Sequence, residues 1–185
     1  IEDAELEPHL ELAREYFLCS YYLAGINFND LCKLTWNNLK DGRISYTRAK
    51  TNAEITTIVL SYPQKVIEKY KLITGIDERN YILPVLHRHT HKSSTQIKDR
   101  IHKVLGQINK GLKQIAKEVG IKENLTTYVA RHSFITHMAN SGKVTPFELK
   151  NMVGHSDLKT TMVYYKDVEQ KKQDELMKKV FNSVG

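Results

Sequence analysis

Cysteine is scarce in this sequence: the 185 residues include only Cys19 and Cys32. Two cysteines cannot build the framework of several disulfides that stabilises small secreted domains. No stretch approaches the roughly 18 consecutive apolar residues that a membrane-spanning helix needs, and no signal peptide opens the chain. We therefore expect free thiols in a reducing compartment, the cytoplasm, and no membrane partner.

Glycine and proline are also few, with nine and four residues, and no segment has low complexity. Hydrophobic residues make up 41% of the chain and charged residues 26%, which are ordinary values for a globular protein and exclude a disordered one. A chain of this length can bury a sizeable core as one domain. Because the first residue is Ile1 rather than methionine, we expect residues 1–185 to be a single domain from a longer protein.

Acidic residues are too few to balance the basic ones, since 21 Asp and Glu oppose 28 Lys and Arg and leave a net charge of +7. In the segment 86–117, eight basic residues oppose Asp99 alone, and this local charge of +7 equals that of the whole chain. The eight are Arg88, Lys92, Lys98, Arg100, Lys103, Lys110, Lys113 and Lys117. One-sided basicity favours a nucleic-acid partner, and an ordinary solvated helix face remains the alternative.

The apolar pattern predicts an α+β fold that is mostly α-helical. Alternating residues on both sides of the turn signal Asp41-Gly42 predict a small antiparallel sheet near residues 43–60. The segment Thr145-Pro146-Phe147-Glu148 is a capping box that predicts the start of a helix. Other helices are expected at residues 9–24, 63–74, 94–118, 127–141 and 167–183.

Some of the predicted helix boundaries depend on single residues. Gly25 is expected to end the first helix, and Asn29 and Asp30 are expected to cap a short second one that runs through residue 34. The long basic helix contains Gly106 and Gly111, and a break near either glycine is an open alternative.

Three segments carry reactive side chains in the C-terminal third of the chain. They are residues 128–134 (Tyr-Val-Ala-Arg-His-Ser-Phe), 153–157 (Val-Gly-His-Ser-Asp) and 160–165 (Thr-Thr-Met-Val-Tyr-Tyr). Arg131 stands among apolar residues of a predicted helix, where its charge is costly unless it meets an anion, either a carboxylate or a phosphate. His155 follows a glycine, so we expect a turn to present its side chain.

In their order and spacing, these segments resemble the tyrosine recombinase, or phage-type integrase, family, and residues 128–134 are most similar to its mobile-element integrases. The resemblance covers nearly the whole chain, as the C-terminal catalytic domain of that family. It implies that the protein cleaves and rejoins duplex DNA through a covalent 3′-phosphotyrosyl intermediate, without a metal or another cofactor. It also implies a separate N-terminal DNA-binding domain in the full-length protein.

The resemblance implies a role for each matching residue. Tyr164 would be the nucleophile, with Tyr165 as its rival, and Arg131 would be the second catalytic arginine. His155 would contact the scissile phosphate, and Lys50 in the hairpin would be the general acid. The chemistry suits these residue types, because arginine binds two phosphate oxygens at once and lysine can protonate the leaving 5′ oxygen. Purely structural roles remain open for each of them.

Two positions depart from the family pattern. Asn27 stands where the family has its first catalytic arginine, and we expect Arg48 to replace that charge because alternate strand residues place it on the same face as Lys50. Tyr128 stands in the place of a histidine and can donate a hydrogen bond to phosphate, but it is a poor base near neutral pH. His132 is expected to point elsewhere on the helix, as a satisfied core histidine.

Contacts with DNA outside the site are expected from the basic segment, through Lys98, Arg100, Lys103 and Arg88. The histidine-rich run at residues 87–91 has no cysteine or carboxylate nearby, so a phosphate-facing or solvated loop is favoured over a metal site. Leu176, Val180 and Phe181 form an apolar stripe on the last helix. The resemblance implies that this tail docks on a neighbouring subunit of a homotetramer on synapsed DNA, formed from free monomers; docking on its own domain is the alternative.

Three other functions remain open. The first is a topoisomerase-like enzyme with the same nucleophile and no exchange of partners. The second is a DNA-binding module whose missing arginine at position 27 reflects lost catalysis. The third is a metal-dependent nuclease.

Overall fold

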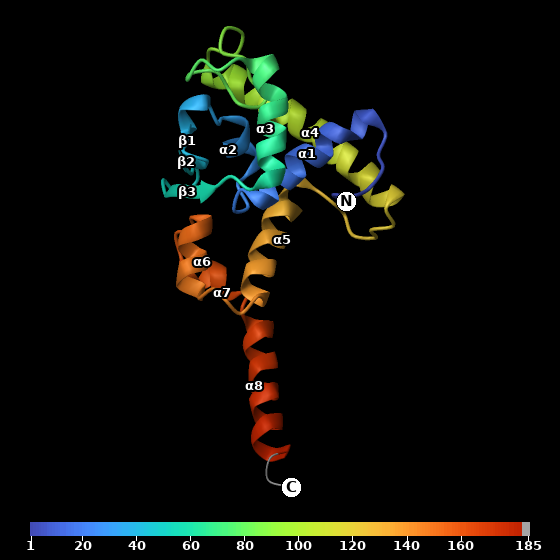
Figure 1. The fold of residues 1–185 in the computed structure, drawn as a ribbon, viewed down its shortest axis with the longest axis vertical. Helices are drawn as coiled ribbons and strands as arrows, with labels where there is room; N and C mark the ends of the chain where they lie inside the picture. Colours follow the sequence, from blue (N-terminus) through green and yellow to red (C-terminus); the bar gives the residue numbers. More distant parts are fainter. Residues whose placement is uncertain (183–185) are drawn as a thin grey trace.

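The computed structural model describes the backbone of residues 1–182 and the side chains of that range except at positions 8, 167–169, 171, 172, 175 and 182. Its helices are α1 (Pro8–Tyr22), α2 (Phe28–Cys32), α3 (Ser61–Thr74), α4 (Ser94–Glu118), α5 (Thr127–Asn140), α6 (Pro146–Val153), α7 (Leu158–Met162) and α8 (Lys166–Asn182), with a 3-10 turn at Trp36–Asn38. Its strands are β1 (Leu39–Lys40), β2 (Arg43–Thr47) and β3 (Glu54–Ile58). The mostly helical α+β fold predicted from the sequence is confirmed (Figure 1).

Helix α1 lies at the centre of the larger core and packs against α3, α4 and α5. The helix α4 is amphipathic and buries Ile101, Val104, Ile108, Leu112 and Ile115, which recur every three or four residues. It is unbroken, so the break near Gly106 or Gly111 does not occur. Gly111 is instead a close-packing position, because a Cβ atom there would lie 2.9 Å from the Cβ of Ala13 on α1.

The three strands form one antiparallel sheet in the order β1-β2-β3. Leu39 pairs with Ile44, and between them Asp41 and Gly42 have φ values of 49° and 68°. Two consecutive left-handed residues make the tight turn that the Asp-Gly pair predicts. The sheet therefore lies in the predicted region, with the short strand β1 as an addition.

The connection from α1 to α2 differs from the prediction. Helix α1 ends at Tyr22, and the chain then turns through Ala24 and Gly25, whose φ values are 57° and 67°. Helix α2 starts at residue 28, with Asn27 in the N-cap position, so the predicted caps at residues 29 and 30 were wrong. Asp30 is buried inside α2, and its Oδ1 accepts a 3.3 Å hydrogen bond from the backbone N–H of Ala49.

A second, smaller core cluster joins α5 to α6 and to Tyr165. The predicted capping box at Thr145 and Glu148 is present and starts α6, and Gly154 ends this helix in a left-handed conformation. Helix α8 then extends away from the rest of the molecule (Figure 1). Among residues 1–182, no helix is long and apolar enough to cross a membrane.

Candidate active site

A cavity of about 140 Å³ lies where the loop before α2, the β2–β3 hairpin, α5 and the residues around α7 meet. It brings together all six catalytic residues proposed from the sequence, namely Arg48, Lys50, Tyr128, Arg131, His155 and Tyr164. Asn27, at the position of the missing arginine, also lines it. The remaining lining residues, which sequence analysis did not assign to the site, are Thr51, His132, Ser156 and Thr160.

Arg131 is a buried cation with no described carboxylate within ion-pair distance, and its side chain is 4% exposed. Its guanidinium donates hydrogen bonds to the carbonyl oxygens of Gly25, at 2.8 Å, and Val153, at 2.6 Å. Burial, together with the neighbouring charge of Arg48, lowers the pKa of Arg131 to about 10, so it still carries its charge at neutral pH. The alternative of a structural pair with a carboxylate is not what the structure shows, and an anion in the cavity would meet an unneutralised charge.

Arg48 is a second buried cation, 5% exposed, beside the first. One of its terminal nitrogens donates to the carbonyl oxygen of Gly154, and its Nε has no hydrogen-bond partner. The strand alternation expected for Arg48 and Lys50 was wrong, because β2 ends at residue 47 and both lie in the loop of the hairpin. The loop instead forms a turn in which the carbonyl oxygen of Arg48 accepts a 2.9 Å hydrogen bond from the N–H of Asn52, and this turn brings both side chains to the cavity.

Each of the two arginines donates a hydrogen bond to the carbonyl oxygen of a glycine in a left-handed turn. Gly25 and Gly154 have φ values of 67° and 62°, which favour glycine. A Cβ atom on Gly25 would lie 3.2 Å from Cγ of Arg131, and one on Gly154 would lie 3.3 Å from Cδ of Arg48 and 2.8 Å from Cδ1 of Ile55. These glycines therefore let the backbone approach closely enough to hold each guanidinium in place.

His155 is held by Thr161, whose buried hydroxyl lies 2.9 Å from its Nδ1. Burial is the main cause that lowers the pKa of His155 to about 4, and the charges of Arg131 and Arg48 lower it further. The imidazole is therefore neutral at pH 7. Sequence analysis missed Thr161, although it belongs to the Thr-Thr pair of the third segment.

Tyr164 lies in the cavity with its hydroxyl 2.6 Å from Nδ1 of His132. Burial raises the pKa of Tyr164, Tyr128 raises it further and Arg131 opposes the change. The expectation that His132 points elsewhere was therefore wrong. The available signal was its spacing, because residues 128 and 132 are four apart on α5 and share one face of the helix.

Tyr165, the rival nucleophile, faces the smaller core cluster instead. It is buried, and its hydroxyl donates a 2.7 Å hydrogen bond to the carbonyl oxygen of Val144. Its role in this structure is packing.

Lys50 and Tyr128 are exposed residues of the cavity. Lys50 precedes Thr51, whose hydroxyl donates a 3.0 Å hydrogen bond to the Gly154 carbonyl and so ties the hairpin to the start of the His155 turn. Tyr128 lies in the first turn of α5, which is anchored on α4 because the N–H of Thr127 donates to Oδ1 of Asn109 at 2.9 Å. Both side chains can reach a ligand from the open side.

The four residues proposed for wider DNA contact do not line this cavity. Lys98 and Lys103 are exposed on α4, whereas Nε of Arg100 donates a 3.0 Å hydrogen bond to the carbonyl of Val85. Arg88 forms an ion pair with Asp77 at 3.1 Å.

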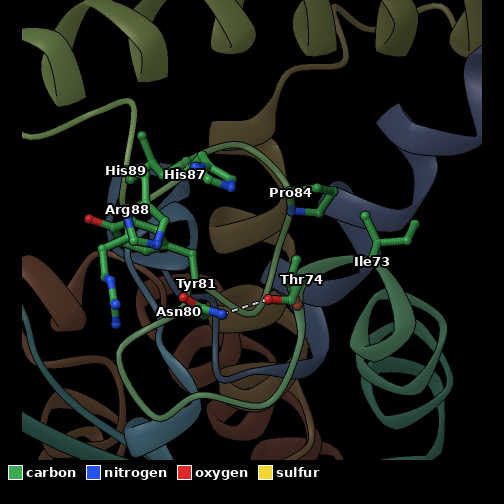
Figure 2. Close-up of a pocket in the computed structure, with 9 residues that line it drawn as sticks. Ile73, Thr74, Asn80, Tyr81, Pro84, His87, Arg88 and His89 are labelled. Atoms are coloured by element: carbon green, nitrogen blue, oxygen red, sulfur yellow. Dashed lines mark hydrogen bonds between the residues drawn. The ribbon is translucent and has the colours of Figure 1, made fainter.

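A larger cavity of about 310 Å³ lies between the end of α3 and the histidine-rich loop. Figure 2 shows His87, Arg88 and His89 on one side of it and Ile73 on the other, with Asn80 donating to the Thr74 carbonyl below. Within the described part of the chain, no group of three or more potential ligand side chains could hold a metal ion.

The sequence model of the phage integrase family matches residues 4–171. The chain belongs to this family. Among curated relatives, a tyrosine recombinase of Pseudothermotoga lettingae is 26% identical over 176 residues, which cover 94% of this chain and 56% of the relative. The tyrosine recombinase XerD of Halalkalibacterium halodurans is 44% identical over 55 residues, which cover 30% of this chain and 18% of the relative. The chain thus spans about half the length of relatives that match it along most of its own length.

Solved structures of integrases and recombinases share the fold of this chain. The integrase of transposon Tn1549, in complex with transposon right end DNA, has a TM-score of 0.66 at 17% identity and covers 95% of this chain and 68% of its own. The XerH site-specific recombinase, bound to a palindromic difH substrate in a post-cleavage complex, has a TM-score of 0.63 at 13% identity. The match covers 96% of this chain and 48% of the XerH chain. The resemblance of the sequence to the phage integrase family implied the fold of that family's catalytic domain, and these structures confirm the fold.

Proposed function

We propose that this chain is the catalytic domain of a site-specific DNA recombinase that cleaves and rejoins duplex DNA through a 3′-phosphotyrosyl bond. The observation that carries the proposal is the cavity in which Tyr164 faces two buried arginines that no described carboxylate neutralises. An unneutralised buried pair of cations is costly, and a phosphate group would repay that cost. Family membership supports the same activity.

In the proposed reaction, the Tyr164 oxygen attacks the scissile phosphorus and the bond from phosphorus to O5′ breaks. The 3′ phosphate becomes an ester of the tyrosine, and Lys50 gives a proton to the leaving 5′ oxygen. Attack by the 5′ hydroxyl of another strand reverses these steps and rejoins DNA. Because one ester replaces another, the exchange needs no high-energy cofactor.

Charge that develops on the non-bridging oxygens would be met by donors fixed before the reaction. Arg131 and Arg48 have their side chains fixed by carbonyl oxygens and retain N–H groups for the phosphate. Neutral His155 would donate from Nε2, which requires the tautomer in which Thr161 donates to Nδ1. Asn27 and Tyr128 are neutral donors at the same cavity.

The nucleophile can be tested with a pool of DNA duplexes that are randomised around a nick, since a nick traps the covalent intermediate by releasing the short downstream strand. The full-length protein should form a protein–DNA adduct that resists detergent, and Tyr164→Phe should abolish it while DNA binding persists. Tyr165→Phe is the matched control and should retain the adduct. Retarded but unreacted DNA would favour the DNA-binding module. Cleavage that leaves no adduct and stops in EDTA would favour the metal-dependent nuclease, and cleavage that persists in EDTA would exclude it.

Strand exchange separates a recombinase from a topoisomerase-like enzyme. The DNA sequence recovered from the covalent adducts is placed in two duplexes of different length. A recombinase should convert these duplexes into recombinant products of new length. If the protein relaxes supercoiled DNA and yields no such products, the topoisomerase-like alternative is correct.

Assembly of a homotetramer on synapsed DNA is part of the proposal, with monomers free in solution. Helix α8 extends away from the rest of the chain and exposes Leu176, Val180 and Phe181 (Figure 1). This arrangement favours docking of the helix on a neighbouring subunit over docking on its own domain. Deleting residues 170–185 should spare adduct formation at a single site and impair pairing of two sites, measured by gel retardation. An unfolded deletion variant would show that the tail stabilises its own domain.

Two further features belong to the proposal. A separate N-terminal DNA-binding domain in the full-length protein would complete a grip on the duplex, and relatives longer than this chain agree with that. The free cysteines Cys19 and Cys32 agree with a cytoplasmic location.

A further inference from the structure

His132 lies between the catalytic cavity and a second groove, and its side chain lines both. On one side it lines the catalytic cavity, where its Nδ1 lies 2.6 Å from the Tyr164 hydroxyl. It also lines a separate, open groove of about 470 Å³ between α5 and Tyr21 of α1. The other lining residues of that groove are Tyr21, Ser133, Thr136, His137 and Asn140. A single imidazole thus connects the nucleophile with a polar surface that is open to solvent.

We propose that His132 is the general base that removes the proton from Tyr164 during cleavage, an inference that rests on the proposed function. As the tyrosine oxygen bonds to phosphorus, its O–H bond breaks and an N–H bond forms at Nδ1 of His132. The resulting imidazolium can release a proton to water in the groove, or return it to Tyr164 when the strand is rejoined. Lys50 supplies the separate proton for the 5′ oxygen.

The other residues of the cavity are poor candidates for this role. No carboxylate lines it among the described residues. Tyr128 is a phenol, and its ring meets the His132 ring edge-on with centroids 4.4 Å apart. Nδ1 of His155 is already occupied by Thr161, and the arginines and Lys50 are cations that act as donors.

The protonation states agree with a base at this position. Burial lowers the pKa of His132, and the charge of Arg131 lowers it further, so the imidazole is neutral and able to accept a proton at neutral pH. The raised pKa of Tyr164 means that the phenol keeps its proton until it attacks. The titratable and charged groups that face His132 from α5, α1 and the residues around α7 are Tyr128, Arg131, His137, Tyr21, His155 and Tyr164.

The test compares His132→Asn with His132→Ala in the full-length protein, using the rate of adduct formation on the nicked pool across pH 4.5 to 9. Asparagine can accept a hydrogen bond near the Nδ1 position but cannot take the proton. We expect both variants to lose at least about 100-fold in rate at pH 7, which is the scale of general-base catalysis. His9→Asn, at an exposed histidine of α1, is the matched control and should keep the wild-type rate.

The shape of the pH profile separates a base from a positioning residue. The wild-type rate should be level above neutral pH and fall in acid as His132 becomes protonated. The rate of His132→Asn should instead rise about tenfold per pH unit and approach the wild type in alkali, as hydroxide replaces the base. A His132→Asn variant with the wild-type rate and profile would overturn the inference while the proposed function stands.

Two other outcomes are also decisive. If both variants fail to fold, the wild-type profile still decides, because a rate that stays level down to pH 4.5 contradicts a histidine base. If the unaltered protein forms no adduct with the pool, the proposed function fails, and this inference fails with it.

Discussion

The side chain of Arg131 packs against the backbone of Gly25 and donates a 2.8 Å hydrogen bond to the Gly25 carbonyl oxygen. Helix α5 and the turn after α1 are thereby joined at the site of the proposed chemistry. The contact depends on the absence of a side chain at position 25, since a Cβ atom there would lie 3.2 Å from Cγ and 3.3 Å from Cα of Arg131.

Gly25→Ala should therefore weaken both the fold and the site. Its left-handed φ of 67° costs an L-residue about 1–2 kcal/mol, and the new methyl group would displace Arg131. We expect this loss in the free energy of unfolding from urea titration, together with slower adduct formation. Gly106→Ala on α4 is the matched control, because nothing lies within 4 Å of that Cβ, and it should stabilise the helix by about 0.5–1 kcal/mol. Equal effects of the two substitutions would contradict this account.

Arg48 should matter for cleavage because it supplies the charge that Asn27 lacks. Arg48→Ala should slow adduct formation by at least about 100-fold, the scale on which one fixed transition-state donor acts. Arg43→Ala, an exposed arginine of the same hairpin, is the control and should react normally. Asn27→Arg should partly restore the Arg48→Ala variant, because position 27 lines the same cavity. A normal rate for Arg48→Ala would show that this charge is not used.

The motifs predicted which residues share one cavity, because each motif is carried by local sequence. The order of Arg131, His155 and Tyr164 identified three segments that the fold brings to one cavity. Local signals of the backbone were equally informative, as the turn at residues 41 and 42 and the capping box at Thr145 show. Each of these depends on a few neighbouring residues.

The errors occurred where distant contacts decide the outcome. His132 was assigned to the core because it follows Arg131, yet the cavity extends around α5 and contacts both residues. The caps of α2 were misplaced because the left-handed turn at Ala24 and Gly25 sets where the helix begins. Arg48, in the hairpin loop, donates a hydrogen bond to the carbonyl oxygen of Gly154, which is 106 residues away in the sequence. No local sequence pattern predicts such a contact.

The basic segment 86–117 should provide affinity that does not depend on DNA sequence. Each neutralised phosphate adds about −0.9 to the slope of log affinity against log salt. Reversing the exposed Lys98 and Lys103 to glutamate should flatten that slope by about 2 if both contact phosphates. The control reverses Lys33 and Lys65, exposed lysines outside the segment, and fluorescence anisotropy with a nonspecific duplex measures both. A slope that changes equally in the two variants would place the DNA surface elsewhere.

Stability should fall in acid because of His155. Its pKa is about 4 in the fold against an ordinary value of 6.5, so the unfolded chain binds the proton more readily. The free energy of unfolding should therefore decrease as the pH falls from about 6.5 and should level off for this group near pH 4. His155→Asn should show a shallower decrease in urea titrations at pH 7, 5.5 and 4.5. An identical pH dependence in the variant would contradict the lowered pKa.

The central claim is that Tyr164 becomes covalently attached to DNA. The most direct measurement is mass spectrometry of the adduct after digestion with nuclease and protease. The account predicts a nucleotide linked through its 3′ phosphate to the side chain of Tyr164, on the peptide that also contains Tyr165. A nucleotide on Tyr165, Tyr128 or any other residue, or no covalent nucleotide at all, would contradict it.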